Sequence, residues 1–208
     1  MSGRPDISQL DAIVLAGGDS RRMGSPKAIL PFGGTTLVGA VVEALRPVFR
    51  QVLVVTRDKA PLSGLDVEIL EDDRPLQGPL VGLARGLSHS GAPWCFLAAC
   101  DMPFLQTKVI QKMAAHLRGC DAVVPEYNGR LQTLHAFYSN SCLSFAEELL
   151  GQGITSMKAL LPRCRVTRLT EDHFASVPGG LQSFRDLDTD EEYRAALNAH
   201  DFPPAQSG

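Results

Sequence analysis

The sequence predicts an α/β domain of three layers, in which helices cover both faces of a mostly parallel β-sheet. Short β-branched and apolar runs alternate along the chain with longer runs whose apolar residues recur at helical spacing. The run Trp94–Cys100 is apolar throughout, which is typical of a strand buried on both faces of a parallel sheet. Such alternation favours strand–helix–strand units with the sheet between two helix layers.

Residue composition assigns the strands. Val, Ile and large apolar side chains favour extended structure, and Asn128-Gly129 predicts a turn between two strands. The expected strands are Ala12–Ala16, Val52–Thr56, Val67–Leu70, Trp94–Cys100, Cys120–Glu126, Leu131–Tyr138 and Arg165–Leu169.

Prolines and small polar residues set the expected helix boundaries. Pro47 ends the first helix, and Pro79 occupies the favoured first turn of the second. Thr107 and Thr189 are candidates for helix N-caps. The expected helices are Leu37–Val48, Pro79–Ser90, Thr107–Arg118, Ser141–Leu150, Ser156–Leu161 and one that follows Thr189.

Composition narrows the class of protein. The 208 residues, 44% of them hydrophobic, are enough for one sizeable core, so we expect one domain over residues 1–208 with a frayed tail at 201–208. A net charge of −3 argues against a nucleic-acid partner, and the absence of an apolar run near ~20 residues argues against a membrane span. The first ten residues lack the apolar core of a signal peptide. These features favour a cytoplasmic protein.

The cysteines are expected to be reduced and buried. Their number is odd and none forms a C-x-x-C pair, so neither a disulfide framework nor a metal site is indicated. Free cysteine in apolar surroundings behaves as a small hydrophobe. The five are Cys95, Cys100, Cys120, Cys142 and Cys164.

A glycine-rich, cationic loop follows the first strand. Gly17 and Gly18 allow close approach of the backbone to a ligand, and Arg21, Arg22 and Lys27 supply positive charge. The loop is not a Walker A motif, because Pro26 immediately precedes the lysine, and its glycine spacing does not match a dinucleotide fingerprint. A phosphate site is favoured over a solvated turn with surface arginines.

Carboxylates stand at the ends of other predicted strands. Asp101 directly follows a buried strand, and Glu71-Asp72-Asp73 follows another. Asp186 and Asp188 precede the last helix. Capping of helices explains some of these residues, but Mg²⁺ also prefers carboxylates together with substrate phosphates. Ligands of parallel sheets lie beyond the carboxyl ends of the strands, so the glycine loop and Asp101 should face one crevice.

These blocks together resemble the molybdenum cofactor guanylyltransferases, also called molybdopterin-guanine dinucleotide biosynthesis protein A. The first block is shared by many nucleotidyltransferases, and the combination is similar to the guanylyl branch. The matching segments are "LAGGDSRRMGSPK" (15–27), "EDD…GPLVGLARGL" (71–87), "CDMPF" (100–104), "QTLHAFYS" (132–139), "SMKALL" (156–161) and "FRDLDT" (184–189).

The resemblance implies a Rossmann-like three-layer sandwich of nucleotidyltransferase type. It implies transfer of GMP from MgGTP to the terminal phosphate of molybdenum-bound molybdopterin, with release of pyrophosphate. Residues 11–118 would form the nucleotide-binding half and residues 119–200 the acceptor-binding half, with the pterin near Gly78–Gly82 and Tyr127–His135. Transient contacts with molybdenum-insertion proteins and target molybdoenzymes are also implied.

The resemblance also implies roles for individual residues. Arg22, Lys27 and Asp101 would be catalytic, and Asp101 together with Asp188 would hold Mg²⁺. The nucleotide would be bound by Leu15, Ala16, Gly17, Gly18, Lys27, Asp72 and Asp101.

The chain departs from the family pattern at two places. Val55-Thr56-Arg57 stands where the family often has an Asn that touches the nucleotide, which makes Thr56 a candidate there. Asp186-Leu187-Asp188 replaces an Asn-x-Asn motif, and this aspartate-rich version resembles related cytidylyltransferases. A CTP-dependent enzyme, a sugar-phosphate nucleotidyltransferase and a nucleotide-binding regulator without chemistry remain the alternatives.

The expected chemistry needs no general base. The attacking phosphate is already ionised near neutral pH, so catalysis consists of positioning and charge neutralisation. His135 is therefore expected to be a hydrogen-bonded part of the scaffold rather than a catalytic residue.

Overall fold

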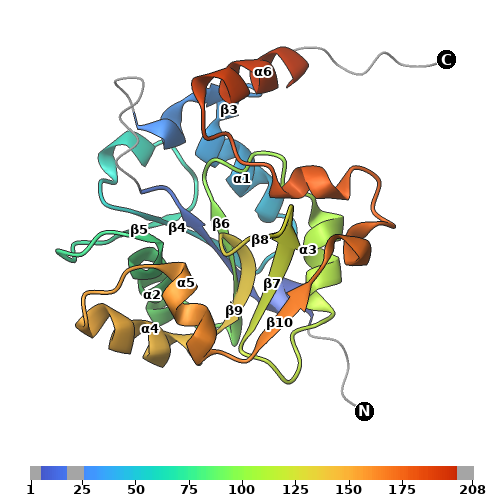
Figure 1. Cartoon of the computed structure of the whole chain (residues 1–208). Coiled ribbons are helices and arrows are strands. Elements are labelled where there is room, and N and C mark those ends of the chain that lie inside the picture. Colours follow the sequence, from blue (N-terminus) through green and yellow to red (C-terminus); the bar gives the residue numbers. More distant parts are fainter. Residues whose placement is uncertain (1–5, 18–25, 201–208) are drawn as a thin grey trace.

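A computed structural model describes residues 6–17 and 26–200 (Figure 1). The strands are β1 (Asp11–Leu15), β2 (Pro31–Phe32), β3 (Thr35–Thr36), β4 (Gln51–Thr56), β5 (Glu68–Glu71), β6 (Trp94–Ala99), β7 (Ala122–Tyr127), β8 (Arg130–Leu131), β9 (His135–Ser139) and β10 (Val166–Leu169). The helices are α1 (Leu37–Leu45), α2 (Pro79–His89), α3 (Thr107–Ala114), α4 (Cys142–Gly151), α5 (Met157–Leu160) and α6 (Asp190–His200). The predicted residues Gly18, Arg21 and Arg22 and the tail 201–208 lie outside the described residues.

One eight-stranded sheet runs through both predicted halves of the chain. Its order is β10-β7-β9-β6-β1-β4-β5, with β8 paired to β7. The pairs of β1 with β4 and β6, of β4 with β5 and of β7 with β10 are parallel. Strand β9 runs antiparallel to both of its neighbours. The mostly parallel sheet is therefore confirmed.

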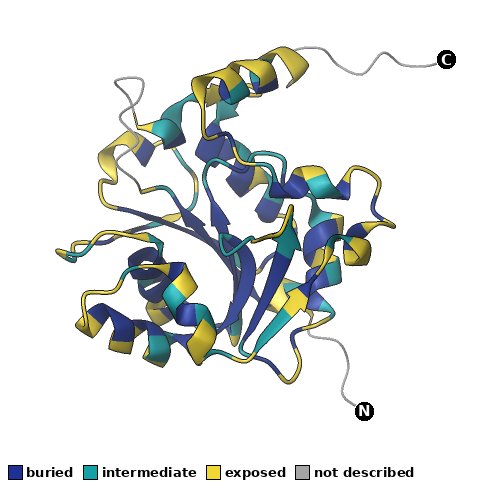
Figure 2. Cartoon of the chain, viewed as in Figure 1, coloured by how far each residue is buried: buried dark blue, intermediate teal, exposed yellow. Residues whose placement is uncertain are grey.

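Helices cover both faces of this sheet, as predicted. In β1, Ala12 and Val14 face one hydrophobic cluster with α1 and α3, whereas Ile13 and Leu15 face another with α2, α4 and α5. Successive side chains of a strand point to opposite faces, so a strand buried on both sides is apolar at every position. Figure 1 shows the two groups of helices on opposite sides, and Figure 2 shows the central strands buried between them.

Several boundaries differ from the predicted ones. The first helix ends at Leu45, and α3 ends at Ala114 rather than Arg118. Thr107 is the first residue of α3 and not its N-cap. Gln106 occupies the N-cap position. Its backbone N–H donates a hydrogen bond to Ser183 Oγ at 2.9 Å, and its side-chain amide donates one to the Gly179 carbonyl at 2.7 Å. Contacts to a distant segment thus set this helix start.

The predicted strand Leu131–Tyr138 is two strands. Asn128 and Gly129 have φ of 49° and 68°, as a two-residue hairpin turn requires, and β8 ends two residues after this turn. The chain then turns, with the His135 N–H bonded to the Gln132 carbonyl at 3.1 Å, before β9 begins. The interruption sends β9 back beside β6.

Other local predictions are confirmed. Pro79 is in the first turn of α2. At the start of α6, the Glu192 N–H donates to Thr189 Oγ1 at 3.1 Å, and the Thr189 N–H donates to Glu192 Oε2 at 2.8 Å. This reciprocal pair is a capping box. All five cysteines lie in the described part and are free thiols, and Cys95, Cys120 and Cys142 are buried as predicted. The prediction of burial was wrong for Cys100 and Cys164, which are only partly buried. None of the helices in the described part has the length and apolar character that crossing a membrane requires.

Two glycines of α2 let this helix lie against β1. A Cβ on Gly86 would be 2.5 to 2.9 Å from three side-chain carbons of Ile13, and one on Gly82 would be 2.6 Å from Leu15 Cδ2. Because Ile13 is fully buried, its side chain has no room to retreat. The close approach therefore depends on the missing Cβ atoms.

We expect Gly86→Ala to lower the free energy of unfolding by about 1–2 kcal/mol, because overpacking outweighs the gain in helix propensity. Urea unfolding measures this change. Gly151→Ala is the control, because a Cβ there meets nothing within 4 Å. Equal stability of the two variants would contradict the packing argument.

His135 is buried without a hydrogen-bond partner, contrary to the expectation of a hydrogen-bonded scaffold. Neither ring nitrogen has a partner, and the ring packs against Phe96 and Phe184 at centroid distances of 5.1 and 4.8 Å. Burial lowers the pKa of His135 to about 3, against a smaller upward effect of the Ser183 backbone. The imidazole is neutral in the folded protein, while in the unfolded chain it is protonated below about pH 6.5.

Because the unfolded chain then binds the extra proton, stability falls as the pH drops below about 6.5. We expect the wild type to lose about 2 kcal/mol more than His135→Leu between pH 7 and pH 5. Urea unfolding at several pH values gives the two slopes. Parallel slopes would show that the histidine does not titrate as described.

Candidate functional site

The carboxyl ends of four parallel strands form one edge of the sheet. Strands β6, β1, β4 and β5 lie side by side, and the segments after them are held by neighbouring strands. The Cys100 N–H donates to the Leu15 carbonyl at 3.0 Å, and the Ala16 N–H donates to the Val55 carbonyl at 2.8 Å. The Asp72 N–H donates to the Thr56 carbonyl at 2.8 Å. The sheet register thus places Gly17, Asp72 and Asp101 at this edge.

Lys27 joins three separate segments above this edge. Its Nζ lies 2.8 Å from Asp101 Oδ2 and 3.3 Å from Asp188 Oδ1. The side chains of Lys27 and Asp101 are 17% and 20% exposed, whereas that of Asp188 is 68% exposed. The Leu187 N–H donates to the Asp101 carbonyl at 3.0 Å and fixes the aspartate-rich segment here. The structure therefore brings Lys27, Asp101 and Asp188 together.

The charges of this cluster depend on one another. Burial lowers the pKa of Lys27, but Asp101 and Asp188 outweigh this effect and the net shift is upward. The ammonium group is thus charged at neutral pH. Burial raises the pKa of Asp186, and the negative charges of Asp188 and Asp101 raise it further. Repulsion among three carboxylates favours the binding of additional positive charge.

The carboxylates suit a metal that is held mainly by substrate. Within the described residues, no group of three or more His, Cys, Asp or Glu side chains is arranged to hold a metal ion. Asp101 and Asp188 do present two oxygens toward one positive charge. Mg²⁺ typically takes one or two carboxylates and completes its shell with phosphate and water oxygens. The pair fits that pattern.

The Asp72 side of the edge is held by local bonds. Asp72 is buried and accepts the Arg74 N–H at 3.3 Å. The Thr56 hydroxyl donates to the Asp58 carbonyl at 3.1 Å and accepts the Asp58 N–H at 3.3 Å. Thr56 stands where the family often has an Asn that touches the nucleotide, but its hydroxyl is bonded to the backbone of the turn that follows it.

Arg57 has a role that sequence reasoning missed. Its Nη1 donates to the carbonyls of Arg74 and Leu76 at 3.2 and 3.1 Å. It thereby connects the end of β4 to the segment after β5 that follows Asp72. The departure from the family pattern at Val55-Thr56-Arg57 was the signal that pointed to this place.

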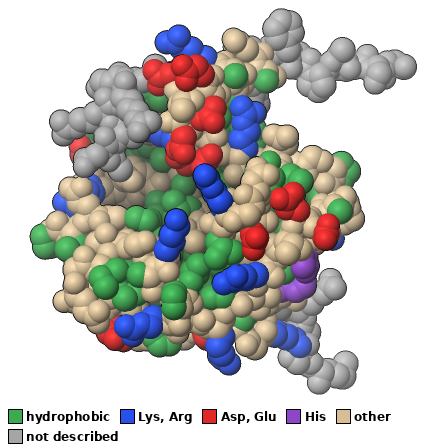
Figure 3. All heavy atoms as spheres, viewed as in Figure 1, with side chains coloured by type: hydrophobic (Ala, Val, Ile, Leu, Met, Phe, Trp, Pro, Cys, Tyr) green, Lys and Arg blue, Asp and Glu red, His purple; other side chains and the backbone are tan. Residues whose placement is uncertain are grey.

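A groove of about 1380 Å³ lies on the side of β7 and β10 and includes Asp186 of the carboxylate cluster. Its apolar surface includes Leu131, Val166 and Phe184. On the face that Figure 3 shows, basic and hydrophobic side chains lie next to a group of acidic ones. Four cations line the groove, namely Arg130, Lys158, Arg168 and Arg185.

The groove only partly matches the predicted acceptor region. Residues 127–132 line it, as the placement of the acceptor near Tyr127–His135 implies. Gly78–Gly82 does not line it: Gly78 packs against Thr155, and Gly82 is buried against Leu15. Lys158, Arg168 and Arg185 were missed as groove residues, because each comes from a different segment. Lys158 and Arg185 lie within the matching segments 156–161 and 184–189, but no sequence pattern brings them to one surface.

The fold and this site define a nucleotidyltransferase. A family model described as MobA-like NTP transferase domain matches residues 12–168, and the chain belongs to this family. The chain is 33% identical over 192 residues to the molybdenum cofactor guanylyltransferase of Desulfosudis oleivorans, covering 91% of this chain and 95% of that protein. It is 37% identical over 171 residues to the probable molybdenum cofactor guanylyltransferase of Mycobacterium tuberculosis, covering 79% and 85%.

The fold is similar to that of a solved relative. The crystal structure of molybdopterin-guanine dinucleotide biosynthesis protein A from Archaeoglobus fulgidus matches with a TM-score of 0.80 and 27% identity, covering 92% of this chain and 98% of that one. The resemblance on which the sequence predictions rest is thereby confirmed. The roles of individual residues stay predictions.

Proposed function

We propose that this protein transfers GMP from MgGTP to the terminal phosphate of molybdenum-bound molybdopterin and releases pyrophosphate. The observation that carries the proposal is the contact of Lys27 with Asp101 and Asp188. These two carboxylates interact with Asp186, which lines the groove together with the four cations. The names of the curated relatives support the choice of nucleotide and acceptor.

The nucleotide lies along the ends of β1, β4 and β5 in this proposal. The backbone of Leu15–Gly17 borders it, because a residue without a side chain at Gly17 leaves room above Thr56 and Arg57. Asp72, which is held by the Arg74 N–H, contacts the nucleoside. Gly18 and Arg22 lie outside the described residues, and their predicted role is to bind phosphate.

Asp101 and Asp188 would hold Mg²⁺, which neutralises phosphate charge when it is bound. Lys27 keeps its proton and places a positive charge beside the leaving pyrophosphate, together with Arg22. The chain orients the acceptor phosphate in line with the α-phosphorus of GTP, and this positioning lowers the barrier. The phosphate is already ionised near neutral pH, so no side chain is needed as a base.

The acceptor occupies the groove. Its phosphate and other anionic groups are attracted by Arg130, Lys158, Arg168 and Arg185, and the flat pterin packs on the apolar part of the surface. Asp186 belongs both to the groove and to the carboxylate cluster. This continuity supports a position of the acceptor phosphate next to the triphosphate.

We expect Asp101→Asn to reduce GMP transfer by at least about 100-fold, because removal of one charge-stabilising group typically costs that much. Release of pyrophosphate from MgGTP in the presence of the acceptor measures it. Asp66→Asn is the control, since that carboxylate is 99% exposed and its ion pair in the described structure is with Arg46, which is also exposed. Near-normal transfer by Asp101→Asn with an unchanged magnesium requirement would refute the metal role.

GTP with Mg²⁺ should stabilise the protein against heat more than CTP with Mg²⁺. A ligand at about 100 times its Kd adds about 2.7 kcal/mol, or roughly 5–10 °C in Tm for a chain of this size. Thermal unfolding with each nucleotide at matched concentrations measures the difference. A larger shift with CTP would reverse the assignment of the base. The aspartate-rich segment 186–188, which resembles that of related cytidylyltransferases, would then be the sequence feature that agrees with cytosine.

A further inference from the structure

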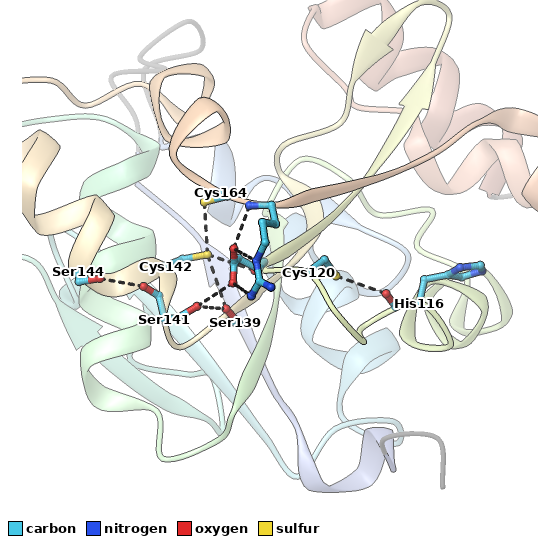
Figure 4. Close-up of polar contacts among 9 residues, drawn as sticks. His116, Cys120, Ser139, Ser141, Cys142, Ser144 and Cys164 are labelled. Carbon is cyan, nitrogen blue, oxygen red and sulfur yellow. Dashed lines mark hydrogen bonds and ion pairs between the residues drawn. The ribbon is translucent and has the colours of Figure 1, made fainter. Parts of the chain in front are cut away.

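Two cysteine thiols lie side by side at the wall of the acceptor groove. Cys142 is the first residue of α4, and Cys164 follows the short helix η4 (Leu161–Arg163) that leads into β10. The two sulfur atoms are 3.6 Å apart. Figure 4 shows both side chains pointing toward one another from these two segments.

The two thiols differ in access. Cys164 is partly exposed and lines the groove, together with its neighbours Leu161, Pro162 and Val166. Cys142 is fully buried, and its thiol lies 3.2 Å from the Asp121 carbonyl. A reagent that enters the groove therefore meets Cys164 first and finds Cys142 directly behind it.

The carboxylate of Asp121 holds the two segments that carry these cysteines in place. The carboxylate of Asp121 accepts the backbone N–H of Arg165 at 2.9 Å and two guanidinium bonds at 3.1 and 3.0 Å. The Ser141 hydroxyl also donates to Asp121, at 3.4 Å. The residue after Cys164 and the residue before Cys142 are thus tied to one carboxylate, as Figure 4 illustrates. The two thiols are therefore held near each other without a disulfide bond between them.

The hydrogen bond between the thiols makes them chemically unequal. It lowers the pKa of Cys164, against an opposing effect of burial. The same bond, together with burial, raises the pKa of Cys142. Cys164 is therefore the better nucleophile, since the thiolate is the reactive form.

The other cysteines lack this arrangement. Burial raises the pKa of Cys95 and of Cys100 to about 12. Cys120 is buried, and its thiol donates to the His116 carbonyl at 3.4 Å. Oxidation-sensitive cysteines are accessible, have a lowered pKa and stand beside a second thiol, and only Cys164 of the five meets all three conditions.

We propose that Cys164 and Cys142 form a reversible oxidation site, with a hydroperoxide as the oxidant, that controls the shape of the acceptor groove. The Cys164 thiolate attacks the outer peroxide oxygen, the O–O bond breaks, and the leaving alkoxide or hydroxide takes up the proton lost by Cys164. The Cys142 sulfur then attacks the sulfenic acid, the S–O bond breaks, and water leaves with the Cys142 proton. One hydroperoxide is reduced and two thiols become one disulfide.

The disulfide changes the groove by moving Cys164. The sulfur atoms must close from 3.6 Å to about 2.05 Å, and the Cys164 side chain must turn toward Cys142, because Cys142 is fixed in the core and Asp121 holds the Arg165 backbone. Leu161, Pro162 and Val166 line the groove on either side of Cys164, so we expect the groove wall between them to change shape. This consequence rests on the proposed function: oxidation should weaken binding of the acceptor and leave nucleotide binding at Lys27 and Asp101 unchanged.

Peptide mapping tests the site independently of any activity. The full-length protein is treated with hydrogen peroxide, its remaining thiols are alkylated, and trypsin separates the two cysteines at Lys158 and Arg163. We expect a linked pair of peptides containing Cys142 and Cys164 that dithiothreitol releases. Cys142→Ser and Cys164→Ser should each abolish the link, whereas Cys120→Ser should retain it. Oxidation of other cysteines before this link forms would overturn the proposal.

Kinetics of the oxidised protein test the consequence. We expect a several-fold rise in KM for the acceptor, reversal by dithiothreitol, and an unchanged thermal shift with MgGTP. Cys142→Ser under the same treatment should show no dithiothreitol-reversible rise. A linked protein with unchanged KM for the acceptor would overturn control of the groove. A protein that forms the link but transfers no GMP even when reduced would instead refute the proposed function.

Discussion

The contact of Lys27 with Asp101 and Asp188 is the interaction on which the arrangement of the site depends. It joins residues that are 74 and 161 positions apart in the chain. Of the three, Lys27 and Asp101 are mostly shielded from water, so their bond is stronger than a surface ion pair and more costly to leave unmade. Asp188 contributes from an exposed position. The cluster thus combines one shielded pair with one exposed carboxylate, an arrangement that is compatible with the proposed binding of a polyphosphate and its cation.

The parallel register of β1 and β6 makes this contact possible. Leu15 is level with Ala99, so the chain leaves both strands at the same height. On one face of the sheet, α2 lies close to β1, because Gly82 and Gly86 carry no Cβ. The strand that ends at the site is therefore packed directly against this helix.

Sequence reasoning succeeded where local pattern determines structure and failed where distant segments do. Apolar runs predicted the central strands, and the rule on strand ends brought Asp101 and the lysine of the loop to one edge. The start of α3 was misplaced, because Gln106 is held by Ser183 and Gly179, which no local signal reveals. The predicted strand 131–138 was wrong for a similar reason: its interruption is needed for β9 to reach β6.

The same distinction separates the two parts of the site. The proposed nucleotide side consists of strand ends, where sequence motifs coincide with positions that the sheet topology fixes, so its residues can be identified from the sequence. The groove is made by pairing β10 with β7, which brings Arg168 into the same groove as Arg130 from the hairpin after β7. No local pattern in the sequence predicts such a surface. The close approach of Cys142 and Cys164 has the same origin, since Arg165 pairs the start of β10 with Asp121 before β7. The proposed acceptor groove is thus formed by long-range pairing, and its two thiols lie where that pairing begins.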